Sequence, residues 1–149
     1  MSAISLPDSA ATEAFGRSLA ERIEPGDVIA LFGPLGAGKT TLARGILNGL
    51  GHSGEVASPT FPIVLPYDPP DTRVPVWHVD LYRIEEPSEL DELGLEEARP
   101  EVALLIEWPE RLPHLWQESL RLTLEPGPDG SRALTAMVPP AWGNRWPTQ

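Results

Sequence analysis

Apolar side chains in the first fifty residues form a helical pattern and then a short continuous run. Between residues 8 and 23 they recur every four positions and so share one face of a helix: Ala11, Phe15, Leu19 and Ile23. Asp8 or Ser9 can cap the start of that helix. The short apolar run DVIALFG at 27–33 ends in glycine and predicts a strand, and residues 39–50 can form a second helix.

Two stretches that contain proline predict the next strands. They are FPIVLPY at 61–67 and VPVWHVDLY at 74–82. Proline cannot donate a hydrogen bond to a strand ladder. Pro62, Pro66 and Pro75 therefore predict an edge position for both strands.

The pattern changes again in the following stretch. SELDELGLEEA, residues 88–98, predicts one amphipathic acidic helix with Leu90, Leu93 and Leu95 turned inward. After it, EVALLIEW at 101–108 opens with a continuous apolar run, which is typical of a strand buried on both faces.

The C-terminal part predicts a hairpin and a tail. Residues 119–125 and 132–138 alternate between apolar and polar positions, and PGPDG between them indicates a tight connection. The order of elements indicates one small α/β domain over residues 1–138, with a mostly parallel central sheet, an antiparallel C-terminal hairpin and few covering helices. We expect residues 139–149 to be a disordered or loosely packed tail.

The charge balance limits which macromolecules this chain can bind by itself. The 149 residues include 22 acidic and 11 basic ones, a net charge of −11, which argues against this chain alone gripping an RNA or DNA backbone. The same acidity is ordinary for a soluble protein. The absence of cysteine excludes disulfides and thiolate metal sites. With no signal-peptide pattern and no apolar run near the ~20 residues that cross a bilayer, we expect a cytoplasmic protein without a membrane partner.

The stretch GPLGAGKTT, residues 33–41, contains the only lysine of the chain. It fits the phosphate-binding pattern G-x-x-x-x-G-K-[ST] between a predicted strand and a predicted helix, so we expect a P-loop NTPase-like fold. Backbone N–H groups of such a loop converge on phosphate oxygens, and a compact ammonium group fits between two phosphates where a planar guanidinium does not. The expected nucleotide-binding residues are Gly33, Leu35, Gly36, Ala37, Gly38, Lys39, Thr40 and Thr41.

Magnesium at such a site needs oxygen ligands besides the hydroxyl group of Thr40. Two acids end predicted strands, Asp80 after VWHV and Glu107 after VALLI. One of them would hold Mg²⁺ while the other positions the attacking water; alternatively, both are solvated carboxylates at strand exits. His78 lies two residues before Asp80 and is expected to be packed or hydrogen-bonded rather than catalytic.

Three further residues allow two interpretations each. Thr60, in the loop sequence SPTF, either senses a γ-phosphate as switch loops do or belongs to an ordinary turn. Trp108 either offers a surface on which a base stacks or is a core residue. Thr41 either contacts an α-phosphate or caps the helix.

No Asn-Lys-x-Asp guanine-reading motif occurs, which favours ATP over GTP as the nucleotide.

Together, these motifs resemble the bacterial TsaE (YjeE-like) family, the ATPase needed to make threonylcarbamoyladenosine in tRNA. The resemblance rests on five stretches in this order: GPLGAGKTTLARGIL, SPTF, HVDLYRI, ELGLEE and LIEWPER. It covers roughly residues 4–138. Many NTPases share the first stretch, whereas the ordered set is specific to the family.

The resemblance implies a P-loop domain that binds ATP and Mg²⁺, hydrolyses ATP weakly alone and is required for threonylcarbamoylation of adenosine in tRNA. Its partners would be a TsaD-like and a TsaB-like subunit, and tRNA would be reached only through that complex. By position, the resemblance assigns catalysis to Lys39, Thr60, Asp80 and Glu107, metal binding to Thr40 and Glu107, and nucleotide contacts to Trp108 and, by a looser alignment, Arg132.

Two other functional classes stay open. A small-metabolite kinase on the same fold needs an arginine-bearing lid, for which Arg99 is a poor candidate and Arg111 a slightly better one. A nucleotide-gated binding module would use ATP only to order the loop at 58–61 so that a partner docks. The acidic helix at 88–98 is most simply a solvated face, and a partner-docking surface is the alternative hypothesis.

Overall fold

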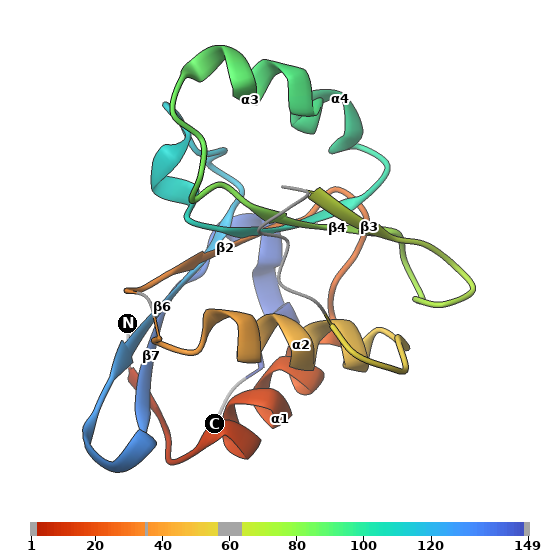
Figure 1. Ribbon diagram of the computed structural model, residues 1–149. Helices are drawn as coiled ribbons and strands as arrows, with labels where there is room; N and C mark the ends of the chain where they lie inside the picture. The colour runs from red at the N-terminus through yellow and green to blue at the C-terminus, as the bar shows by residue number, and fades with distance from the viewer. Residues whose placement is uncertain (1–2, 35, 57–63, 148–149) are drawn as a thin grey trace.

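The computed structural model describes residues 3–34, 36–56 and 64–147. Within these ranges, seven strands form one sheet that carries helices on both faces (Figure 1). The strands are β1 (Ala3–Leu6), β2 (Val28–Phe32), β3 (Val64–Tyr67), β4 (Val76–Asp80), β5 (Ala103–Glu107), β6 (Leu120–Pro126) and β7 (Arg132–Met137). The helices are α1 (Ser9–Ala20), α2 (Lys39–Gly49), α3 (Pro87–Leu93) and α4 (Leu95–Ala98), with short 3-10 helices η1 (Pro109–Arg111), η2 (Pro128–Gly130) and η3 (Pro140–Arg145).

The sheet is parallel in its centre and antiparallel at both margins. Its strand order is β1-β7-β6-β2-β5-β4-β3, and β6, β2, β5 and β4 run parallel to one another. β7 pairs antiparallel with β6 and with β1, and β3 pairs antiparallel with β4. The predicted α/β class and C-terminal hairpin are confirmed. β1 was not predicted, because its four residues become a strand only through pairing with β7.

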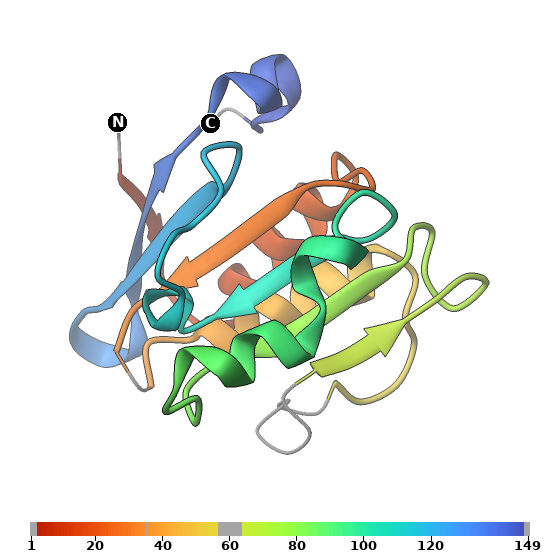
Figure 2. The same cartoon turned by 90° about the horizontal axis from the view of Figure 1, so that it is seen from above.

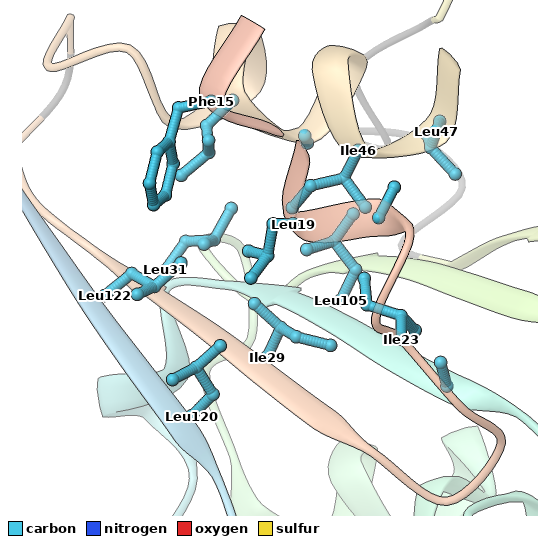
Figure 3. Close-up of a cluster of buried hydrophobic side chains, with 14 of the residues drawn as sticks. Phe15, Leu19, Ile23, Ile29, Leu31, Ile46, Leu47, Leu105, Leu120 and Leu122 are labelled. Carbon is cyan, nitrogen blue, oxygen red and sulfur yellow. The ribbon is translucent and has the colours of Figure 1, made fainter. Parts of the chain in front are cut away.

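Helices cover both faces of the sheet. α1 and α2 lie on one face, and α3 and α4 lie on the other (Figures 1 and 2). None of the helices in the described ranges has the length and apolar character that crossing a lipid bilayer requires. On the α1–α2 face, side chains of both helices meet those of the central strands (Figure 3): Phe15, Leu19, Ile29, Leu31, Ile46, Leu47, Leu105, Leu120 and Leu122. Burial of this apolar surface fixes α2 on the sheet.

Glycine allows α1 and α2 to pack at close range. A Cβ atom on Gly16 of α1 would lie 2.7 Å from the carbonyl oxygen of Leu42 in α2. A Cβ atom on Gly45 of α2 would overlap the carbonyl oxygen of Glu13. Because the interior is close-packed, a larger side chain at either position would push the two helices apart.

The edge-strand prediction holds for β3 and is wrong for β4, which lies between β3 and β5. Pro66 is part of the edge strand, where its missing N–H is tolerated. Pro75 precedes β4 and contributes only its carbonyl oxygen, which accepts the N–H of Ala103 at 2.9 Å. Proline immediately before a strand therefore does not require an edge position. Pro62 lies outside the described residues.

The helix predicted over 88–98 consists of two helices. Gly94 ends α3 and precedes α4 with a φ of 72°, in the left-handed region that glycine favours. Leu90 and Leu95 are buried and Leu93 is half-buried, so the inward-facing leucines are confirmed. The break escaped prediction because the apolar spacing continues across the glycine.

The segment from 139 to 147 packs onto the domain, which differs from the expectation of a disordered or loosely packed tail. Trp142 in η3 is 1% exposed and belongs to the core on the α1–α2 face. The guanidinium group of Arg145 donates to both carboxylate oxygens of Asp27, at 2.8 and 3.0 Å. These contacts are tertiary and leave no periodic pattern in the sequence.

We expect Trp142→Ala to lower the free energy of unfolding by about 3–5 kcal/mol, because it empties a large buried site. Urea denaturation followed by circular dichroism measures the change. Asn144→Ala, at an exposed position of the same segment, is the control and should change the value by less than about 0.5 kcal/mol. Equal stability of Trp142→Ala and the wild type would show that the segment is not part of the core.

Candidate functional site

A pocket of about 400 Å³ opens where β2, β4 and β5 end. These strands are parallel, so their carboxyl ends lie at one edge of the sheet, where α/β proteins bind ligands. The residues that line the pocket are Gly36, Gly38, Lys39, Thr40, Thr41, Asp80, Tyr82, Arg83, Glu107, Trp108 and Arg132.

The loop between β2 and α2 is closely packed against β7. Gly38 is the N-cap residue of α2 and has a φ of 103°, which strains any residue other than glycine. A Cβ atom on Gly38 would also overlap the guanidinium group of Arg132. Nε of Arg132 is buried and makes no hydrogen bond within the described part of the chain. A polar group that lies at the pocket without a partner is suited to binding a ligand.

The ammonium group of Lys39 lies deep in this pocket. The residue is only 5% exposed, and its Nζ donates a hydrogen bond to the carbonyl oxygen of Gly33 at 2.5 Å. The same atom lies 3.5 Å from the ring centroid of Trp108, within the range of a cation–π interaction. Lys39 is therefore positioned by the backbone on one side and by an aromatic ring on the other.

Burial lowers the pKa of Lys39, because removal from water disfavours the charged form. The negative charges of Glu107, Glu110 and Asp80 oppose this decrease. Burial has the larger effect, so the pKa stays below its ordinary value.

Trp108 is the first residue after β5 and turns the chain over the pocket. Its φ of 60° lies in the left-handed region, which only tertiary contacts make favourable for tryptophan. Its ring packs at 4.9 Å and 48° against Tyr82, and the guanidinium carbon of Arg111 lies 5.8 Å from the Tyr82 ring centroid. A row of cationic and aromatic groups thus runs from Lys39 through Trp108 and Tyr82 to Arg111.

The two strand-end acids lie side by side, because β4 and β5 pair with Asp80 opposite Glu107. They are 8% and 3% exposed, so neither is a solvated carboxylate at a strand exit. The hydroxyl group of Thr40 donates to Oε1 and Oε2 of Glu107 at 3.3 and 3.4 Å. The structure therefore pairs Thr40 with Glu107 and places Asp80 next to them.

The pKa of Asp80 is raised, first by burial and then by the negative charge of Glu107. The backbone N–H of Tyr82, which donates to Oδ1 of Asp80 at 2.9 Å, opposes the increase, as do the charges of His78 and Lys39. A buried carboxyl group with a raised pKa is a better proton acceptor than an ordinary aspartate.

His78 fixes the position of Glu107. The imidazole is fully buried, and its Nε2 lies 2.8 Å from Oε2 of Glu107. This confirms the prediction of a hydrogen-bonded histidine and explains why His78 does not line the pocket.

The candidate metal ligands are the hydroxyl group of Thr40 and the carboxylate of Glu107. In the described ranges, no group of three or more His, Cys, Asp and Glu side chains is arranged to hold a metal ion. Mg²⁺ does not need such a group, because it keeps several water ligands and shares phosphate oxygens with one or two protein ligands. Thr40 and Glu107, which are in direct contact, fit that requirement.

Most of the residues predicted from the sequence meet in this pocket: Gly36, Gly38, Lys39, Thr40, Thr41, Asp80, Glu107, Trp108 and Arg132. Gly33 and Ala37 do not line it; Gly33 accepts the hydrogen bond of Lys39, and Ala37 is buried in the core. Leu35 and Thr60 lie outside the described residues. Tyr82 and Arg83 also line the pocket and were not predicted, although their places two and three residues after the strand-end acid Asp80 were an available signal.

Known proteins resemble this chain over most of its length. The family model "Threonylcarbamoyl adenosine biosynthesis protein TsaE" matches residues 6–134. A Synechocystis sp. protein named tRNA threonylcarbamoyladenosine biosynthesis protein TsaE is 43% identical over 120 residues, which cover 74% of this chain and 71% of that protein. The Bacillus subtilis protein of the same name is 40% identical over 140 residues, which cover 91% of this chain and 82% of that protein.

A solved structure also resembles this chain over most of its length. The crystal structure of Bacillus subtilis YdiB superposes with a TM-score of 0.77 and 31% identity, covering 97% of this chain and 90% of that chain. The architecture is that of a small P-loop NTPase-like domain. From the family model, the sequence relatives and the shared architecture, we conclude that this chain belongs to the TsaE family.

Proposed function

We propose that this chain is a Mg²⁺-dependent ATPase of tRNA threonylcarbamoyladenosine biosynthesis that acts in the cytoplasm with TsaD-like and TsaB-like subunits. Family membership supports the pathway. The observation that carries the ATPase chemistry is the meeting of Lys39, Thr40, Asp80 and Glu107 in one pocket. The net charge of −11 supports placing contacts with tRNA on the partner subunits.

The end of the pocket at α2 is suited to the phosphates of ATP. The N-terminus of a helix offers unpaired backbone N–H groups and the positive end of its dipole, both of which favour an anion. Lys39, the first residue of α2, adds a full positive charge at this point. A phosphate there would replace the carbonyl of Gly33 and the ring of Trp108 as the partner of its ammonium group.

Thr40 and Glu107 are the residues that would hold Mg²⁺. Both supply hard oxygen ligands, and their direct contact supports a site in which one ion would bind to both. When bound, Mg²⁺ would neutralise negative charge on the phosphate oxygens of ATP. His78 keeps the Glu107 carboxylate turned towards Thr40 through its 2.8 Å hydrogen bond.

With Glu107 committed to the metal, Asp80 is the group that positions water. Attack of the water oxygen on the γ-phosphorus breaks the bond to the β–γ bridging oxygen and yields ADP, phosphate and a proton. The raised pKa of Asp80 suits its carboxylate to orient that water and take up the proton.

In this proposal Trp108 lies beside the phosphates, so we do not assign its ring to stacking on the base. Its ring contacts the ammonium group of Lys39 and the ring of Tyr82. We assign the ring to the exclusion of water around Lys39, which strengthens the attraction between lysine and phosphate. Arg132 is assigned a contact with the nucleotide, because its Nε is buried at the pocket and has no hydrogen-bond partner among the described residues.

Lys39→Ala should weaken ATP binding by about 30- to 150-fold, because it removes a charge-assisted contact worth about 2–3 kcal/mol. Lys39→Arg should not restore affinity, because the space between Gly33 and Trp108 holds a compact ammonium group and not a planar guanidinium. Isothermal titration calorimetry with Mg-ATP measures both. Arg17→Ala, at an exposed position of α1, is the control; wild-type affinity in Lys39→Ala would contradict the proposed phosphate site.

Asp80→Asn should leave ATP affinity within about threefold of wild type and lower turnover in the presence of the two partner subunits by about 100-fold or more. The amide keeps the shape of the side chain but cannot accept a proton. Phosphate release measures turnover. Asp68→Asn, which neutralises an exposed acid outside both pockets, should retain full turnover. Full turnover in Asp80→Asn would remove this residue from the mechanism.

Thr40→Val should raise the Mg²⁺ concentration needed for half-maximal turnover by about tenfold or more, because it deletes one oxygen ligand without a large change in volume. Glu107→Gln should act in the same direction. Turnover is titrated with Mg²⁺ at fixed ATP, with Thr135→Val in β7 as the control. An unchanged Mg²⁺ requirement in both site variants would place the metal elsewhere.

A further inference from the structure

A second cavity, of about 470 Å³, lies between the α3–α4 segment and the loop that follows η1. It shares no lining residue with the nucleotide pocket. α3 and α4, whose residues line it, lie on the sheet face away from α1 and α2 (Figure 2). Its apolar wall consists of Leu90, Leu95, Leu112 and Trp116, all of which pack in the hydrophobic cluster on that face. We call this cavity the α3–α4 groove.

The rim of the α3–α4 groove is acidic. Asp91, Glu96 and Glu97 line it with exposed side chains. They belong to a stretch, residues 84–98, that contains no Lys or Arg and seven acids: Glu85, Glu86, Glu89, Asp91, Glu92, Glu96 and Glu97. Among the described residues that line the groove, His114 is the one basic side chain.

One acid of the rim and the apolar wall are fixed to each other. The indole N–H of Trp116 donates to Oε1 of Glu96 at 2.7 Å. On the neighbouring side, Arg99 donates to Glu118 at 2.8 Å and its guanidinium carbon lies 5.4 Å from the Trp116 ring centroid. Arg99 is therefore engaged with Glu118 and Trp116 and does not line the groove.

From the apolar wall, the acidic rim and the volume of the groove, we propose that the α3–α4 groove docks a partner-protein segment that presents an arginine or lysine next to a leucine or similar apolar side chain. The apolar side chain fills the space against Leu95 and Trp116, and the cation meets the carboxylates of Asp91 and Glu97. This inference rests on the proposed function in one respect: the segment belongs to a subunit of the tRNA-modifying complex.

Charge decides among the possible occupants. A second copy of this chain brings another net charge of −11 and so repels the rim. Nucleic acids and anionic lipid surfaces are repelled for the same reason. A cationic protein segment is the occupant that the charge of the rim attracts.

The first test uses short peptides and the indole N–H signal of Trp116 in a two-dimensional NMR spectrum, assigned with Trp116→Phe. A blocked leucyl-arginyl-leucine tripeptide should shift this signal in a saturable way. A blocked leucyl-glutamyl-leucine tripeptide should not. Equal shifts with both peptides, or none with either, overturn the assignment of a cationic occupant.

The second test measures assembly with the TsaD-like and TsaB-like subunits. Asp91→Lys/Glu97→Lys should weaken assembly by about tenfold or more while Mg-ATP affinity stays unchanged. Glu96 is left intact because it holds Trp116. The control, Glu21→Lys/Asp68→Lys, makes the same charge change at exposed positions outside the groove and should assemble like wild type.

The outcomes distinguish a wrong docking site from a wrong proposed function. Normal assembly of the groove variant, or an equal loss in the control, overturns the docking site and leaves the proposed function standing. Failure of the wild-type chain to assemble with either subunit contradicts the proposed function, and the peptide experiment then decides the groove alone. Self-association that the groove variant abolishes would identify a second copy as the occupant and overturn the proposal.

Discussion

A buried ammonium group and two buried carboxylates lie together at the carboxyl edge of the central strands. The candidate site depends on their opposite charges, which offset the free-energy cost of burying each group. Lys39, Asp80 and Glu107 are each less than one-tenth exposed. Buried charges are stable only when they are paired or hydrogen-bonded. Lys39 is stabilised by the carbonyl of Gly33 and by nearby acids, and Glu107 by His78 and Thr40. In the proposed function, a magnesium-bound triphosphate would add charges of both signs, with Lys39 facing the phosphates and Glu107 facing the metal ion.

The fold creates this arrangement through strand register and close helix packing. Parallel pairing of β4 with β5 sets Asp80 opposite Glu107, and parallel pairing of β2 with β5 brings the loop between β2 and α2 to the same edge. Gly16 and Gly45 let α1 and α2 approach closely, which fixes the start of α2. The helices α3 and α4, on the other face, contribute nothing to this pocket and enclose the groove instead.

Much of the site could be predicted because its signals are local in sequence. The spacing from Gly33 to Thr41 and the acids at two strand ends are visible without a structure. Contacts between distant segments were not predictable. The burial of Trp142, the pairing of Arg145 with Asp27 and the pairing of β1 with β7 depend on partners far away in the chain. The interior position of β4 was missed because Pro75 precedes the ladder and does not take part in it.

The central claim concerns where a triphosphate binds and which groups contact it. A crystal structure of this chain with Mg²⁺ and a non-hydrolysable ATP analogue tests it most directly. We predict phosphates at the N-terminus of α2, Nζ of Lys39 on the β- and γ-phosphate oxygens, and Mg²⁺ between Thr40 and Glu107 with Asp80 facing the γ-phosphate. An analogue bound elsewhere, or Mg²⁺ held without Thr40 and Glu107, would contradict the account.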